Sequence, residues 1–274
     1  EHDLDRTALV DGMSGAETTY RQLIGQIDLF AGALAARGIG VGDAVGLLCP
    51  NVPAFATVFH GILRSGATAT TINALYTADE IANQLRDASA FWLITVSPLL
   101  PQAQAAAEQL GLPADQLIVL DGAEGHPSLR SLLAEGHHAP DVHFDPATHV
   151  AVLPYSSGTT GRPKGVMLTH RNLVANVAQS TVSIDLNDED RILAVLPFFH
   201  IYGMTVLLNL AVRLRATLVT MPKFDLVEFL RIIAEQRTSW LFIAPPIAVA
   251  LAKHPLVEQY DMSSVNVVFS GAAP

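Results

Sequence analysis

The sequence predicts an α/β fold in which parallel sheets are covered by helices. Short apolar runs alternate along the chain with longer segments whose apolar residues recur every three to four positions. Several of the short runs are apolar at consecutive positions, as is typical of strands buried on both faces. Charged residues make up 15% of the chain, well under the roughly 25% of an average soluble domain, which favours extensive buried faces.

The first half of the chain contains four predicted strands. Thr18 or Thr19 can cap a helix that ends at Gly38 and carries an apolar stripe of Leu23, Ile27, Phe30 and Leu34. The elements that follow are a strand at 44–49, a helix opened by Pro53, a strand at 67–72, a helix after the capping box of Thr77 and Glu80, a strand at 91–96, a helix around 102–110 and a strand at 117–120.

The second half resumes the alternation after a polar stretch, 121–148, which we expect at the surface with one short helix near Leu129. The predicted elements are then a strand at 150–153, a glycine-rich loop, a returning strand at 166–168, a helix from Thr169 to about 183, a strand at 192–196, a helix after Tyr202, a strand at 217–221, a helix capped by Asp225 with Glu228, a strand at 240–243, a helix at 245–253 and a strand at 265–269.

Two uncharged stretches, 44–63 and 192–212, are long enough to span a bilayer. Each is interrupted by helix breakers and polar residues, which are Pro50, Asn51, Pro53 and His60 in the first and Pro197, His200, Gly203 and Asn209 in the second. Such a stretch reads as a strand followed by a helix. The amino terminus has no basic start before an apolar run and therefore predicts no signal peptide. We expect a soluble protein without integral membrane insertion.

Charge and cysteine content exclude some classes of function. A net charge of −10 argues against a nucleic-acid surface and requires any polyphosphate site to be locally cationic. The chain has one cysteine, Cys49, and so no internal disulfide. A reduced, cytoplasmic setting fits, with Cys49 as a small core residue.

The segment Tyr155-Ser-Ser-Gly-Thr-Thr-Gly-Arg-Pro-Lys-Gly165 is the most informative in the chain. Its glycines allow tight turns that direct N–H groups into one concavity, while its hydroxyls and Lys164 add further donors for phosphate oxygens. It differs from the P-loop because Gly165, and not Ser or Thr, follows Lys164. A flexible hairpin with a solvated lysine is the alternative. The position at the end of a buried strand, where α/β proteins bind ligands, favours a polyphosphate site.

Residues 156–164 resemble the phosphate-loop signature of the adenylate-forming superfamily, which includes acyl-CoA synthetases, firefly luciferase and adenylation domains. Residues 153–155, 165–170, 196–203 and 270–274 resemble its 4-coumarate–CoA ligase branch. The resemblance implies a layered N-terminal domain that ends before the C-terminal lid domain. We expect a first α/β subdomain at 43–188 and a second formed by 1–42 and 189–274.

The same resemblance implies roles for individual residues. ATP would be held by Ser156, Ser157, Gly158, Thr159, Thr160, Gly161, Lys164, Gly271, Ala272 and Ala273. Lys164 and His200 would be catalytic, and the acid would contact His200, Tyr202 and Ala272. Lys223 would contact coenzyme A. Without the resemblance, His200 and Tyr202 would be read as core residues and Lys223 as a surface lysine.

The implied reaction joins a small carboxylic acid to coenzyme A through an acyl-adenylate, with ATP and Mg²⁺. The Mg²⁺ ligands would lie mostly beyond Pro274, so the chain by itself is expected to have little turnover. Many plant coumarate ligases have a lysine where this chain has Phe269, and Val206 is also apolar. Both favour an apolar acid pocket, for an aromatic acid or, alternatively, a medium- or long-chain fatty acid.

Other classes of function remain open. A phosphotransferase with the same loop would release ADP, and a non-catalytic nucleotide- or acyl-binding module would release no product. The histidines at 126, 137, 138, 143 and 149 lie in a loop-like region without a metal-binding spacing, so we expect a solvated surface there and no metal site. The sequence does not indicate an oligomeric state.

Overall fold

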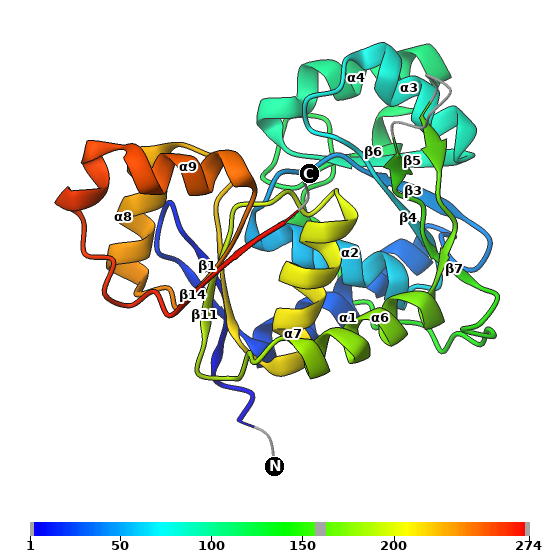
Figure 1. Ribbon diagram of the computed structural model, residues 1–274. Helices are drawn as coiled ribbons and strands as arrows, with labels where there is room; N and C mark the ends of the chain where they lie inside the picture. Colours follow the sequence, from blue (N-terminus) through cyan, green and yellow to red (C-terminus); the bar gives the residue numbers. More distant parts are fainter. Residues whose placement is uncertain (1–2, 157–162, 272–274) are drawn as a thin grey trace. The chain divides into compact units, whose positions relative to one another are not determined.

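The computed structural model describes residues 3–156 and 163–271, which form two compact units. Unit 1 comprises Glu1–Gln22, Pro50–Pro53 and Ala175–Pro274, and unit 2 comprises Leu23–Cys49 and Ala54–Val174. Each unit is built on a six-stranded sheet in which most strands are parallel (Figure 1). The predicted α/β class is confirmed.

The sheet of unit 2 has the order β10 (Leu168–Thr169), β7 (Val150–Val152), β4 (Thr68–Thr71), β3 (Ala44–Leu47), β5 (Ala90–Thr95) and β6 (Leu117–Val119). β10 pairs antiparallel with β7, and the other pairs are parallel. The helices are α1 (Tyr20–Ala36), α2 (Pro53–Arg64), α3 (Ala78–Asp87), α4 (Leu100–Leu110) and α5 (Leu129–Ala134), with short 3₁₀ turns at Ser97–Leu99 and Ala114–Gln116. Residues of α3, α4 and the strands share one apolar core.

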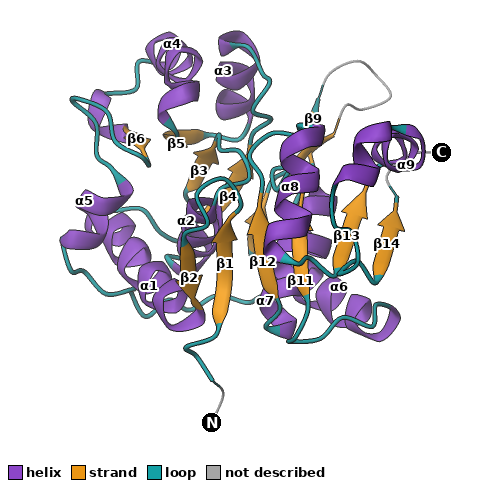
Figure 2. Ribbon diagram, turned by 90° about the vertical axis from the view of Figure 1, so that its left-hand side faces the viewer, coloured by secondary structure: helices purple, strands orange, loops and turns teal. Residues whose placement is uncertain are grey.

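The sheet of unit 1 has the order β14 (Val267–Ser270), β13 (Trp240–Ile243), β11 (Arg191–Ala194), β12 (Thr217–Thr220), β1 (Thr7–Asp11) and β2 (Glu17–Thr19). The helices α8 (Leu226–Gln236) and α9 (Pro245–Lys253) pack on this sheet and share its apolar core (Figure 2). The π-helix η3 (Gly203–Asn209) continues into α7 (Leu210–Leu214), and a 3₁₀ turn covers Pro255–Gln259. Helix α6 (His170–Ser183) links the hairpin region to β11.

Several predicted helix starts are confirmed by their caps. Thr77 and Glu80 form the predicted capping box at the start of α3. Asp225 caps α8 by accepting a hydrogen bond from the backbone N–H of Glu228. Of the two candidates for α1, Thr19 supplies the cap, because its hydroxyl accepts from the N–H of Gln22 at 3.2 Å. These helices were predictable because a cap depends on residues close together in the chain.

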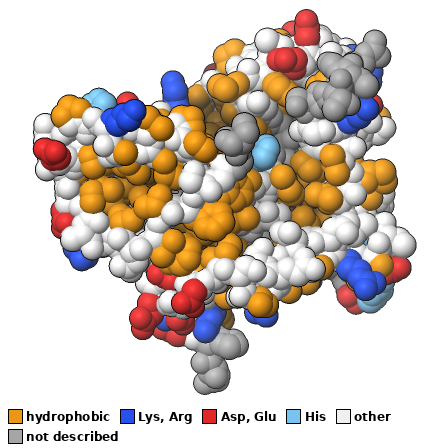
Figure 3. Space-filling model, in the orientation of Figure 1, with side chains coloured by type: hydrophobic (Ala, Val, Ile, Leu, Met, Phe, Trp, Pro, Cys, Tyr) orange, Lys and Arg blue, Asp and Glu red, His pale blue; other side chains and the backbone are white. Residues whose placement is uncertain are grey.

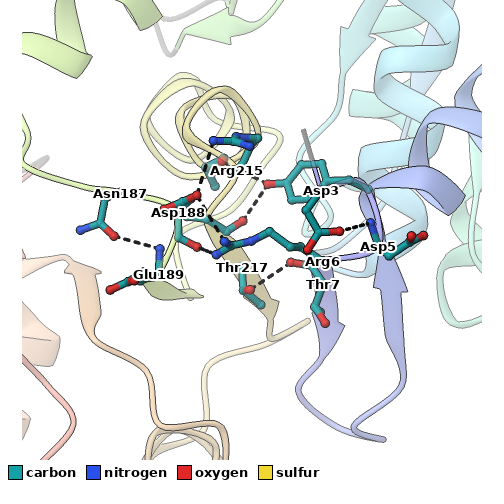
Figure 4. Close-up of polar contacts among 12 residues, drawn as sticks. Asp3, Asp5, Arg6, Thr7, Asn187, Asp188, Glu189, Arg215 and Thr217 are labelled. Atoms are coloured by element: carbon teal, nitrogen blue, oxygen red, sulfur yellow. Dashed lines mark hydrogen bonds and ion pairs between the residues drawn. The ribbon is translucent and has the colours of Figure 1, made fainter. Parts of the chain in front are cut away.

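Strands β1 and β2 were not predicted. β1 is short, and it is fixed by partners distant in sequence, because Thr217 donates to the carbonyl of Thr7 at 3.0 Å. Beside it, Arg6 donates to the carboxylate and the carbonyl of Asp188, and Arg215 donates to the same carboxylate (Figure 4). A strand of five residues that depends on such distant partners is too short to show a clear alternation of apolar and polar residues in the sequence.

The predicted returning strand at 166–168 is wrong in its bounds. The chain forms two short strands, β9 (Lys164–Gly165) and β10, each with a different partner. Val166 and Met167 lie between them and are exposed. The register breaks there because β9 pairs with β8 (Tyr155–Ser156), whereas β10 pairs with β7.

Burial agrees with the prediction for Cys49, which is fully buried, and burial raises the pKa of its thiol. Among the described helices, none is long and apolar enough to cross a membrane. Some large apolar side chains do reach the surface, among them Val268 and Phe269 on the edge strand β14. Figure 3 shows apolar side chains on one face of the molecule.

Candidate active site

In unit 1, several predicted site residues follow the carboxyl ends of parallel strands. β1, β12, β11, β13 and β14 all run in the same direction, so their carboxyl ends share one edge of the sheet. His200 comes after β11, Lys223 after β12 and Gly271 directly after β14. This edge is where open α/β sheets bind their ligands.

Tyr202 and Gly271 lie against each other at this edge. A β-carbon placed on Gly271 would sit 3.2 Å from the Tyr202 hydroxyl, so a larger residue there would crowd the phenol. That hydroxyl is buried and has no hydrogen-bond partner among the described residues, and burial raises the pKa of Tyr202. It is therefore a neutral donor without an acceptor.

His200 is exposed, and its Nδ1 accepts a hydrogen bond from the backbone N–H of Tyr202 at 3.3 Å. A ring that accepts at Nδ1 carries its proton on Nε2. The alternative reading of His200 as a buried core histidine is wrong, because the segment turns its ring to the surface at the sheet edge.

The chain between β11 and η3 turns too tightly for a side chain at Gly203. A β-carbon there would lie 2.1 Å from the carbonyl oxygen of Pro197, which no real contact allows. The backbone N–H of His200 donates to the same carbonyl at 3.1 Å. Pro197 and Gly203 together set the turn that presents His200 and Tyr202.

A buried asparagine, which was not singled out from the sequence, holds the start of this segment. The side-chain amide of Asn51 donates to the carbonyls of Ala194 at 3.0 Å and Leu196 at 2.8 Å. Its oxygen accepts from the N–H of Phe198 at 2.8 Å. The available signal was a polar residue between Pro50 and Pro53, directly after a buried strand.

In unit 2, the ends of the glycine-rich loop form a short antiparallel hairpin. Tyr155 pairs with Gly165 and Ser156 with Lys164, and Ser156 and Lys164 are exposed. The predicted ATP-binding residues Ser157, Gly158, Thr159, Thr160 and Gly161 lie outside the described residues, as do Ala272 and Ala273. The hairpin follows the buried strand β7, as predicted.

Helix α3 anchors the base of this hairpin. The Tyr155 hydroxyl donates to the Asp87 carboxylate at 2.5 Å, and the ring lies over Gly165. Burial, then the bond to Asp87 and its charge, raises the pKa of Tyr155, so the phenol stays protonated near neutral pH. Gln84 donates to Thr70 at 2.9 Å, and Thr70 donates to the carbonyl of Leu153 at 2.9 Å.

Two clefts border the hairpin within unit 2. One, of about 540 Å³, lies between α3 and the hairpin and is lined by Tyr76, Glu80, Asp87, Tyr155 and Pro163. The other, of about 340 Å³, is lined by Thr68, Asp87, Tyr155 and Gly165 among others. The Tyr155–Asp87 pair therefore lines both clefts.

The predicted site residues divide between the units. Ser156 and Lys164 belong to unit 2, whereas His200, Tyr202, Lys223 and Gly271 belong to unit 1. Within unit 1 the structure brings Tyr202 into contact with both His200 and Gly271. Lys223 is exposed in the bend after β12, as a surface lysine would be.

The histidine-rich region contains a stacked group. The rings of His149 and His170 lie on Phe144 with centroids 4.2 Å and 4.6 Å away, and His149 Nε2 contacts the carbonyl of Gly66 at 2.9 Å. A solvated position was expected for His149, and that expectation is wrong, because this stack half-buries it. Within residues 3–156 and 163–271, no group of three or more His, Cys, Asp or Glu could hold a metal ion.

The model of the family described as "AMP-binding enzyme" matches residues 1–274. The chain belongs to this family. The family is adenylate-forming, as the loop at 156–164 predicts, and the resemblance to its acyl-CoA ligases is confirmed.

Curated relatives are 4-coumarate–CoA ligases. The chain is 37% identical to "4-coumarate--CoA ligase 2" of Petroselinum crispum over 276 residues, which cover 98% of this chain and 50% of that protein. It thus spans about half the length of the curated relatives that it matches.

Solved structures share this fold, among them the N-terminal domain of FACL13 from Mycobacterium tuberculosis, with a TM-score of 0.87 and 27% identity over 98% of this chain and 67% of that chain. The anthranilate CoA ligase AuaEII in complex with anthranoyl-AMP matches with a TM-score of 0.89 and 27% identity, over 97% of this chain and 52% of that chain. The long-chain-fatty-acid-CoA ligase FadD1 of Archaeoglobus fulgidus matches with a TM-score of 0.89 and 27% identity, over 98% and 55%. The chain therefore has the fold of the N-terminal domain of adenylate-forming enzymes.

Proposed function

We propose that the protein activates a carboxylic acid with ATP and transfers the acyl group to coenzyme A. The observation that carries this proposal is the hairpin at the mouth of the glycine-rich loop, which pairs Ser156 with Lys164 at the end of a parallel strand. Family membership and the relatives support the same reaction.

The first step forms an acyl-adenylate. A carboxylate oxygen attacks the α-phosphorus of ATP, and pyrophosphate leaves with the electrons of the broken P–O bond. Two anions must approach each other, so donors that offset phosphate charge lower the barrier. We assign this role to the Lys164 ammonium group and to the hydroxyls and amides of residues 156–161.

The second step transfers the acyl group. The thiolate of coenzyme A attacks the acyl carbon, and AMP leaves with the oxygen that came from the acid. His200 would orient the acid at the sheet edge through Nε2, since its Nδ1 accepts from Tyr202. Lys223, exposed at the same edge, would contact a phosphate of coenzyme A.

For the acid itself, we propose an aromatic, cinnamate-like compound. The relatives are 4-coumarate ligases, and one structural neighbour holds anthranoyl-AMP. Phe269 and Val206 are apolar at positions that the resemblance assigns to the acid pocket, which favours a ring without a phenolic hydroxyl. A fatty acid is the second candidate, because a structural neighbour is a long-chain-fatty-acid ligase.

The test is acid-dependent ATP–pyrophosphate exchange by the full-length protein that contains this chain. The panel holds cinnamate, coumarate, benzoate and fatty acids of increasing length. We expect the fastest exchange with cinnamate-like acids. Exchange confined to long-chain acids would overturn the aromatic assignment, and ADP as the product would overturn adenylation. The chain by itself should exchange slowly, because its relatives are about twice as long.

A further inference from the structure

We infer that Asn51 is a positioning residue for the proposed reaction, which fixes the segment that carries His200 and Tyr202. This inference rests on the proposed function of that segment. Asn51 does not itself touch the reacting groups in this account. It acts through the backbone of residues 194–198.

Asn51 uses both of its amide protons and its amide oxygen on the backbone of one segment. Both amide protons have carbonyl acceptors, on Ala194 and Leu196, and the amide oxygen has a donor, on Phe198. The residue is 4% exposed, so water cannot easily replace these bonds. Leaving a buried polar group without its partner costs more than the bond itself contributes.

The segment needs such a partner because it is irregular. β11 ends at Ala194, Pro197 has no N–H, and the next helical hydrogen bonds begin after His200. The carbonyls of Ala194 and Leu196 and the N–H of Phe198 therefore lie at and just beyond the point where the ladder of β11 ends. Asn51 satisfies all three from a position 143 to 147 residues earlier in the chain.

The chemistry of the side chain is specific. Aspartate has the same shape but no donor, and would place a carboxylate against two carbonyl oxygens. Alanine removes all three bonds. With aspartate or alanine at position 51, the backbone before Pro197 would lose its anchor. The turn of Pro197 and Gly203 would then shift, and His200 would be displaced. A displacement of about 1 Å at a catalytic group can cost on the order of 10²-fold in rate.

The first arm of the test measures activity in the full-length protein. Asn51→Ala and Asn51→Asp should lower kcat/KM for the acid by about 10²-fold, with KM for ATP changed much less. The matched control is Thr217→Val, which removes a partly buried hydrogen bond of unit 1 at the opposite end of the strands. Thr217→Val should destabilise the fold and leave kcat/KM unchanged.

The second arm is a double-mutant cycle with His200→Ala. If Asn51 acts through His200, then Asn51→Ala with His200→Ala should be no slower than His200→Ala alone. The inference would be overturned if the losses in kcat/KM of the two single variants multiplied in the double variant. It would also be overturned if Asn51→Ala were as active as the parent.

The third arm does not depend on the reaction. Amide hydrogen exchange of 195–204 should become at least about tenfold faster in Asn51→Ala and stay unchanged in Thr217→Val. Unchanged protection in Asn51→Ala would overturn the positioning role. If the parent protein shows no acid-dependent ATP–pyrophosphate exchange, the proposed function fails. Amide hydrogen exchange then decides by itself whether Asn51 holds the segment.

Discussion

Two regions carry the candidate chemistry, and they are held in different ways. The hairpin of Tyr155–Gly165 is a local structure: its strands are joined by one loop, and its base rests on α3 through the exposed pair Tyr155–Asp87. The segment from Leu196 to Gly203 has no ladder of its own and depends on the buried amide of Asn51. The comparison teaches that the proposed phosphate loop could be chosen from its own residues, whereas the segment proposed to position the acid depends on a distant residue.

The largest expected effect concerns the charge at the hairpin. Lys164→Ala in the full-length protein should lower the rate of acid-dependent exchange by about 10²–10³-fold, because it removes the charged donor assigned to the transition state. Exchange kinetics at saturating acid measure this. Lys253→Ala, at the exposed end of α9, is the matched control and should keep the parent's rate. An equal loss of exchange rate in both variants would contradict a role of the hairpin in the reaction.

The next effect tests how tightly the other region is packed. Gly203→Ala should destabilise the protein by about 3 kcal/mol, because its β-carbon would meet the Pro197 carbonyl. Gly25→Ala, in α1 with open space among the described residues, should instead stabilise by about 0.5–1 kcal/mol. Denaturant unfolding compares the two. A tolerated Gly203→Ala would show that the turn relaxes readily and needs no precise anchor.

A smaller effect is expected at the base of the hairpin. Tyr155→Phe removes one hydrogen bond, worth about 0.5–1.5 kcal/mol, and should raise KM for ATP by no more than about tenfold. Tyr76→Phe, in the same cleft, is the control. The comparison predicts a smaller loss for Tyr155→Phe than for Asn51→Ala. The reverse order would mean that the hairpin is the more demanding of the two regions.

The smallest expected effect concerns unit 2, which contains the hairpin, and is a dependence of its stability on pH. Burial, then the nearby His149, lowers the pKa of His170 in the folded protein. The unfolded state therefore binds more protons below about pH 6.5, and stability should fall as the pH drops through that value. His170→Phe should weaken this fall in unfolding experiments between pH 7 and 5. His143→Gln, largely exposed, should keep the parent's profile, and a parent without any fall would contradict the burial argument.

The sequence predicted what depends on near neighbours and missed what depends on distant ones. The cap of α3 and the exact bounds of β13 and α9 follow from local residues. Strand β1 needs Thr217 and the Arg6–Asp188 pair, which periodicity cannot reveal. In the site, Lys164 and His200 could be chosen from their motifs. Asn51 and Asp87 could not, because their partners lie 68 to 147 residues away.

The central claim is that an oxygen of the acid attacks the α-phosphorus of ATP. The most direct test supplies the full-length protein with the acid labelled with ¹⁸O in its carboxylate, together with ATP and coenzyme A. Mass spectrometry of the products should find one ¹⁸O atom in AMP and none in pyrophosphate. Label in inorganic phosphate, with ADP as the nucleotide product, would contradict the account.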